Sequence, residues 1–99
     1  MVGIKSYGVY IPYYRVSRAE IGKFWESFQL PGEKAVANFD EDAVTMGVEA
    51  CRDCLTGFDR AGIGGLYFAS TTFPYLEKQY SAQAAGTLDL SQDALTIDF

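Results

Sequence analysis

The chain is short, acidic and rich in hydrophobic residues. It has 99 residues, of which 48% are hydrophobic and 15% aromatic, and its formal net charge is −5. This composition excludes a disordered chain, and the length is that of one domain or a part of one. The acidic balance, without any cluster of Lys and Arg, argues against nucleic acid as a partner. Because no signal peptide and no membrane-spanning run is apparent, we expect a cytoplasmic protein with no membrane partner.

The start of the sequence predicts a strand followed by a short helix. Residues 2–11 alternate in polarity and are rich in β-branched and aromatic side chains, which predicts a strand that ends at Pro12. Ser17 and Glu20 have the spacing of a capping box, so a helix should begin there. Aromatic residues at helical spacing give this helix an apolar face, and Pro31 marks its end.

A second helix is predicted over residues 41–56, after a loop with weak extended character over residues 33–39. Small and apolar side chains recur along it at helical spacing: Val44, Gly47, Val48, Cys51 and Leu55. The acidic run Asp40, Glu41 and Asp42 is interpreted as the cap of this helix, where it would complement the helix dipole. Adjacent acids at a helix start cannot converge on one ion, so a metal site is the weaker alternative.

The stretch that organises the chain is a short apolar run with hydroxyl residues after it. Residues 66–69 are continuously apolar, which predicts a strand covered on both faces in a parallel sheet. Ser70, Thr71 and Thr72 follow at its carboxyl end, where open α/β sheets place ligand-binding groups. An ordinary hydroxyl-rich turn after a core strand is the alternative interpretation.

The remaining residues predict a helix over 75–88 and a strand over 94–99. The expected element order is β-α-α-β-α-β, in the α/β class, with a mostly parallel sheet. Three strands are few for such a sheet. Residues 1–99 are therefore interpreted as an incomplete part of one domain.

Few residues offer catalytic chemistry of their own. The chain has no His, which excludes a Ser-His-Asp or Cys-His site within it. Cys51 and Cys54 form a C-x-x-C motif inside the second predicted helix, and we interpret them as thiols facing the core. A redox pair or half of a zinc site are the alternatives, but the other ligands of a zinc site are missing. We predict no metal site and no bound cofactor.

Four stretches, in the same order, resemble the archaeal-type hydroxymethylglutaryl-CoA synthases of the thiolase superfamily: residues 2–15, 33–36, 40–50 and 68–75. The resemblance covers nearly the whole chain. It implies a thiolase-like layered fold built from two repeated halves, with this chain as the N-terminal part of the first half. The family moves an acyl group from CoA onto a cysteine, which by this resemblance lies just beyond Phe99, and then condenses it with a second thioester.

One position departs from the family pattern. The resemblance aligns Thr71 with the synthases' general acid/base glutamate, so this chain holds none of the family's catalytic residues. A hydroxyl cannot replace a carboxylate as a proton carrier near neutral pH. The parent protein is therefore expected to be an acyltransferase that resembles hydroxymethylglutaryl-CoA synthase, with a ketoacyl synthase III-like enzyme, which lacks this glutamate, as the alternative.

The resemblance also suggests a substrate and partners. Acyl-CoA is the expected substrate, with Thr71 and Thr72 as candidate binding residues and Lys34 as the cation placed to meet a CoA phosphate, unless Lys34 is a plain surface lysine. The parent protein would be a homodimer that works beside a thiolase and a small OB-fold protein. The rival interpretation is a non-catalytic half-domain that binds partners through an open sheet edge.

Overall fold

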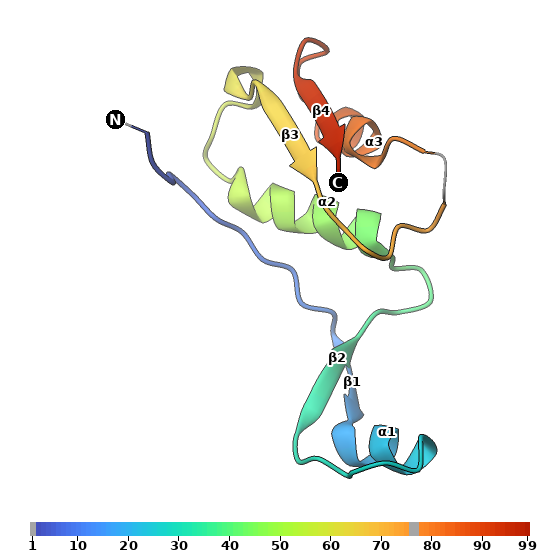
Figure 1. Ribbon diagram of the computed structural model, residues 1–99. Helices are drawn as coiled ribbons and strands as arrows, with labels where there is room; N and C mark the ends of the chain where they lie inside the picture. Colours follow the sequence, from blue (N-terminus) through green and yellow to red (C-terminus); the bar gives the residue numbers. More distant parts are fainter. Residues whose placement is uncertain (1, 76–77) are drawn as a thin grey trace. The chain divides into compact units, whose positions relative to one another are not determined.

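The computed structural model describes residues 2–75 and 78–99. Its elements, in chain order, are β1 (Tyr14–Ser17), α1 (Arg18–Phe24), β2 (Glu33–Val36), α2 (Ala43–Cys54), the 3₁₀ helix η1 (Arg60–Gly62), β3 (Gly65–Phe68), α3 (Tyr80–Thr87) and β4 (Leu95–Asp98) (Figure 1). They form two compact units, one of Ile11–Glu41 and one of Met1–Tyr10 with Asp42–Phe99. No helix in the described part of the chain is long and apolar enough to span a membrane.

The larger unit is built on a parallel pair of strands. β3 and β4 pair from Gly65 opposite Leu95 to Phe68 opposite Asp98. Backbone hydrogen bonds continue past the strands, from Phe99 N to Phe68 O (2.7 Å) and from Ser70 N to Phe99 O (3.2 Å). The parallel pairing was predicted from the apolar run of β3 and from the alternation of strands and helices along the sequence, and it confirms the α/β class.

The helices α2 and α3 cover one face of this pair. The core consists of Val48 from α2, Phe68 from β3, and Ala84 and Leu88 from and after α3. Side chains alternate along a strand, so Tyr67, Leu95 and Ile97 lie on the other face, where they are exposed.

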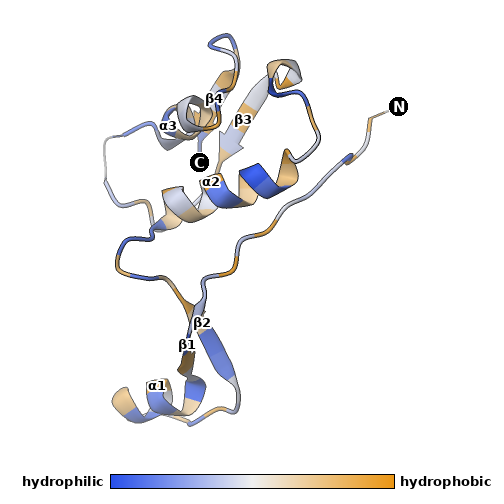
Figure 2. Ribbon diagram, turned by 180° about the vertical axis from the view of Figure 1, so that it is seen from behind, coloured by the Kyte–Doolittle hydropathy of each residue, from blue (hydrophilic) through white to orange (hydrophobic). Residues whose placement is uncertain are grey.

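A close contact between α2 and β3 sets the spacing of helix and sheet. A methyl group at Gly47 would overlap the far end of the Phe68 ring, which is itself buried. Glycine is therefore needed here so that the helix backbone can approach the ring. Hydrophobic and hydrophilic residues alternate along α2 (Figure 2). This alternation is expected for a helix that carries the predicted apolar stripe on one side.

The cap of α2 follows the sequence prediction. Asp42 Oδ1 accepts hydrogen bonds from the backbone amides of Val44 and Thr45, both at 2.9 Å, and Thr45 Oγ1 accepts one from Asp42 N. Asp42 alone of the three acids is the N-cap, since Glu41 instead accepts a hydrogen bond from Asn38 N (2.8 Å).

The predicted first strand is wrong. Residues 2–11 carry no strand and run beside α2, where Ser6 Oγ donates to Cys54 O (2.7 Å) and Val9 N donates to Asp53 Oδ2 (3.1 Å) (Figure 1). An alternating pattern favours an extended backbone, but a strand also requires a partner strand, and none pairs with these residues in the described structure.

The smaller unit holds an antiparallel pair that the sequence did not predict. β1 pairs with β2 from Tyr14 opposite Val36 to Ser17 opposite Glu33, with α1 between them, although residues 33–39 were expected to form a loop. The capping box at Ser17 is also wrong, because its side chain makes no capping hydrogen bond. The expected sheet of three mostly parallel strands is therefore two separate pairs, one parallel and one antiparallel.

The third predicted helix is shorter than expected. α3 spans Tyr80–Thr87 instead of residues 75–88, and residues 76 and 77 of that prediction lie outside the described part of the chain. The strand β4 agrees with its predicted range to within one residue at each end.

Two helical glycines give a matched test of the core. Replacing Gly47 by Ala should lower the free energy of unfolding by about 1–3 kcal/mol, because the new methyl group collides with Phe68 in a packed core. Gly86 in α3 has open space around it, so Gly86→Ala should stabilise the protein by about 0.5–1 kcal/mol through helix propensity. Urea unfolding of both variants checks this, and equal effects of the same sign would contradict the packing described here.

Candidate functional site

Hydroxyl groups gather at the carboxyl edge of the parallel pair. In the turn after β3, Thr72 N donates to Ser70 Oγ at 3.0 Å, and the Ser70 and Thr72 hydroxyls lie 3.2 Å apart. Thr71 is exposed at the tip of this turn and makes no hydrogen bond within the described residues. The bond from Ser70 N to Phe99 O holds the turn beside the end of β4. The sequence-predicted Thr71 and Thr72 thus lie at a strand edge of the expected kind, and their contact with a substrate stays a prediction.

The chain after this turn is fastened to the core by aromatic rings. Phe73 stacks on Tyr80 with ring centroids 4.5 Å apart, and its ring lies 5.7 Å from that of Phe68. The Tyr80 hydroxyl accepts a hydrogen bond from Tyr75 N (2.5 Å) and donates one to Tyr75 O (2.8 Å). The turn is therefore anchored on both sides, which favours one fixed arrangement of its hydroxyl groups.

Asp98 is the residue of this edge that the sequence did not single out. Its carboxylate accepts hydrogen bonds from Tyr80 N (2.6 Å) and Ser81 N (2.7 Å), and so caps the start of α3 from the end of β4. Burial acts to raise the pKa of Asp98, but the hydrogen bonds from Ser81 and from the Tyr80 amide outweigh it and hold that pKa below its ordinary value. The partners are 17 and 18 residues away, so no local pattern indicates them.

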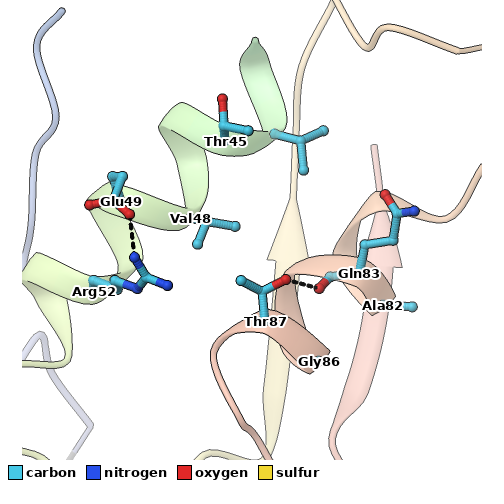
Figure 3. A pocket seen from close by; sticks show the side chains of 9 residues that line it. Thr45, Val48, Glu49, Arg52, Ala82, Gln83, Gly86 and Thr87 are labelled. Atoms are coloured by element: carbon cyan, nitrogen blue, oxygen red, sulfur yellow. Dashed lines mark hydrogen bonds and ion pairs between the residues drawn. The ribbon is translucent and has the colours of Figure 1, made fainter. Parts of the chain in front are cut away.

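An apolar hollow of about 270 Å³ lies next to the turn. It is lined by Ala43, Gly47, Cys51, Phe68, Ala69 and Ser70, and Ser70 is the residue among them that carries a hydroxyl group. A larger hollow of about 660 Å³ lies between α2 and α3, with the Glu49–Arg52 ion pair (2.5 Å) at its border (Figure 3). None of the sequence-predicted binding residues lines this second hollow.

The cysteines of the C-x-x-C motif are both free and half-buried. Cys51 packs against the core, as predicted. Burial, and to a lesser degree the neighbouring Cys54, raise the pKa of the Cys51 thiol, which disfavours the reactive thiolate. Residues 2–75 and 78–99 contain no group of three or more His, Cys, Asp or Glu side chains that could hold a metal ion.

Lys34 lies in the other unit, on β2 opposite Val16. The structure therefore does not join it with Thr71 and Thr72 in one unit. Its surroundings hold a second cation that the sequence analysis did not consider, Arg18 at the start of α1.

Comparison with known proteins gives a consistent set of relatives, although no protein-family model matches the chain. It is 41% identical to the hydroxymethylglutaryl-CoA synthase of Thermococcus gammatolerans over 99% of its length, and 35% identical to that of Methanosarcina mazei. These matches cover 29% and 31% of the two relatives, so the chain spans about three-tenths of their length.

Solved structures share the fold. Xanthomonas campestris OleA with bound acetamide matches 96% of the chain with a TM-score of 0.84 at 18% identity. MvaS in complex with 3-hydroxy-3-methylglutaryl coenzyme A matches 97% with a TM-score of 0.81 at 22% identity. These likenesses cover 34% and 25% of the two structures. The chain therefore has the fold of the thiolase-like synthases. Within that class its sequence is similar to the archaeal hydroxymethylglutaryl-CoA synthases.

The cap that Asp98 forms on α3 should make stability depend on acid pH. A lowered pKa in the folded state means that the unfolded chain binds more protons, so the contribution of Asp98 is complete above about pH 4, the ordinary Asp value, and is lost as the pH falls through the folded-state pKa. Asp98→Ala should cost about 0.5–2 kcal/mol near neutral pH, as for other lost caps. Urea unfolding across this pH range measures both effects.

Asp98→Asn is the matched control for charge, because it keeps an acceptor oxygen at the same place. It should lose the acid dependence while costing less stability than the Ala variant. If the wild type and the Asn variant lost stability in parallel as the pH falls, the cap would not be the source of the dependence.

Proposed function

We propose that the protein carrying this chain is an acyl-CoA condensing acyltransferase of the hydroxymethylglutaryl-CoA synthase type. The observation that supports it most directly is the 41% identity to a curated synthase over 99% of the chain. In this reaction a cysteine thiolate attacks an acyl-CoA, the CoA thiolate leaves, and the acyl group is then joined to a second thioester. The 99 residues contain no His, so the protein must supply the rest of the site from other residues.

The described residues would contribute one wall of that site. The turn after β3 presents hydroxyl groups at the edge where β4 also ends, and the bond from Ser70 N to Phe99 O joins the two ends. The Thr71 side chain is exposed at the tip and makes no hydrogen bond to any residue that the structure describes, so it is free to contact an acyl group or thioester oxygen. Thr72 is the next residue in the same turn.

The residue type at position 71 supports a second candidate function. Because a Thr stands where the resemblance places the synthases' glutamate, proton transfer by that group is not available here. A ketoacyl synthase III-like condensation, in which loss of carbon dioxide from a malonyl thioester supplies the nucleophile, does not need this carboxylate. The fold is compatible with it, since 3-oxoacyl-(acyl-carrier-protein) synthase III matches with a TM-score of 0.82.

A non-catalytic role is the third candidate. The face of the parallel pair that carries Tyr67, Leu95 and Ile97 is exposed in this structure, and an open sheet can bind a partner.

If the protein is an enzyme, we propose that it is a cytoplasmic homodimer that acts beside a thiolase and an OB-fold protein, as the family resemblance suggests.

Product analysis separates the two enzymatic candidates. The full-length protein is incubated with acetyl-CoA together with either acetoacetyl-CoA or a malonyl thioester, and the products are identified by mass spectrometry. The proposal predicts a hydroxymethylglutaryl thioester from the acetoacetyl-CoA mixture. A β-ketoacyl product that requires the malonyl thioester would instead support the ketoacyl synthase III-like reaction, and no product in either mixture would leave the non-catalytic role.

The role of Thr71 can be tested by removing its hydroxyl group alone. Thr71→Val should slow condensation roughly tenfold, the effect of one lost hydrogen bond, while acylation by acetyl-CoA continues. Thr56→Val is the control, because the Thr56 hydroxyl donates to Arg52 O near the end of α2 and its removal should leave both steps unchanged. Unaltered condensation by the Thr71 variant would remove this residue from the site.

A further inference from the structure

Asp98 and the turn after β3 belong to one closed ring of contacts. On one side, the backbone of β4 continues from Asp98 to Phe99, whose carbonyl accepts the hydrogen bond from Ser70 N (3.2 Å) at the start of the turn. On the other side, the Asp98 carboxylate accepts hydrogen bonds from Tyr80 N and Ser81 N at the start of α3. The end of β4 is therefore bonded to the chain both before and after the turn.

Tyr80 completes this ring. Its side chain is 2% exposed, its ring stacks on that of Phe73 with centroids 4.5 Å apart, and its hydroxyl bonds to both the N and the O of Tyr75. Because Tyr80 N donates to Asp98, the carboxylate holds the residue that holds the far side of the turn.

The start of α3 depends on this carboxylate because its own N-cap residue serves another contact. Gln79 stands at the N-cap position, and its side chain makes no capping hydrogen bond. Its side-chain nitrogen donates instead to Thr96 O and Thr96 Oγ1, both at 3.1 Å. Removing the Asp98 carboxylate takes the acceptor from two amides at once, so the first turn of α3, which includes Tyr80, should loosen.

The position of Thr71 depends on its neighbours in the turn. Its side chain is exposed and makes no hydrogen bond to the residues that the structure describes. A displacement of a reacting group by about 1 Å can slow a reaction by about 10²-fold, even when its cause lies far from the chemistry. A small movement of the turn is therefore enough to affect a reaction that uses Thr71.

We propose that Asp98 is a positioning residue for the condensation step, which acts through Tyr80 on the turn that carries Thr71. This role rests on the proposed function. It needs no contact between Asp98 and a substrate, since Oδ2 accepts from Tyr80 N and Oδ1 from Ser81 N. Removing the carboxylate should lower kcat for condensation and leave the KM of the second thioester unchanged.

Kinetics of the full-length protein test this role, with acylation by acetyl-CoA and condensation with the second thioester measured separately. Asp98→Ala should slow condensation roughly tenfold, to about the rate of Thr71→Val, and leave acylation unchanged. Asp98→Asn should recover part of the rate, because its amide oxygen keeps one acceptor, and it also reports on the role if the Ala variant does not fold. In the Thr71→Val background, Asp98→Ala should cause no further slowing, since both changes act on the same group.

Asp42→Ala is the matched control for lost stability. Asp42 accepts hydrogen bonds from two backbone amides at the start of α2, as Asp98 does for α3, and its hydrogen bonds in the described part of the chain stay within residues 42–46. It should leave condensation unchanged. Equal slowing by Asp42→Ala and Asp98→Ala would overturn the proposal, and so would equal slowing of acylation and condensation by Asp98→Ala.

Amide hydrogen exchange on the same preparations measures the connection to the turn without relying on activity. Exchange at Tyr75 N, which donates to the Tyr80 hydroxyl, should rise roughly tenfold in Asp98→Ala and stay unchanged in Asp42→Ala. Unchanged exchange at Tyr75 in Asp98→Ala would overturn the proposal even if condensation were slow.

The two measurements together distinguish failure of this proposal from failure of the proposed function. If the wild type condenses and Asp98→Ala condenses at the same rate, the positioning role is overturned and the condensing enzyme stands. If the wild type neither takes up an acetyl group nor condenses, the proposed function is overturned together with the kinetic role of Asp98. The exchange at Tyr75 then still decides whether Asp98 holds the turn.

Discussion

The larger unit depends on one contact, the Phe68 ring against the bare backbone of Gly47. It joins the centre of α2 to β3 and leaves no room for a methyl group between them. Phe68 also accepts the backbone hydrogen bond from Phe99 and lies against Phe73, so the same residue connects the helix, the second strand and the turn that carries the hydroxyl groups. Any change in the distance between α2 and β3 would therefore move the candidate site as well.

The candidate site is held in place by hydrogen bonds between residues that are far apart in the sequence. Ser70 is tied to Phe99, and Asp98 is tied to the start of α3. Both contacts use the ends of the parallel pair, because the carboxyl ends of parallel strands meet at the same edge. This arrangement leaves Thr71 exposed at the tip of a turn whose two sides are fixed, which is a suitable geometry for a group that must meet a substrate in a defined position.

Local patterns in the sequence were enough where the structure is local. The cap at Asp42 and the apolar stripe of α2 depend on residues within a few positions, and both were predicted. Residues 2–11 show the opposite case, since alternation favours an extended backbone but does not identify a partner strand. Three other features join residues at least 16 positions apart, and no local pattern indicates such contacts. They are the β1–β2 pair, the cap from Asp98 to α3 and a hollow that Arg18 and Lys34 both line. Ser17 failed as a capping residue at the end of β1, where its backbone conformation fits a cap but its side chain makes no capping bond.

Similarity in fold and sequence supports the proposed function, in which the protein would be a condensing synthase that works through a covalent acyl-enzyme and these residues would form one part of its site. The most direct test of this account is the intact mass of the full-length protein before and after incubation with acetyl-CoA. The account predicts a gain of one acetyl group, reversed when a second thioester substrate is added. An unchanged mass would contradict covalent condensation, and the shared fold would then serve binding alone.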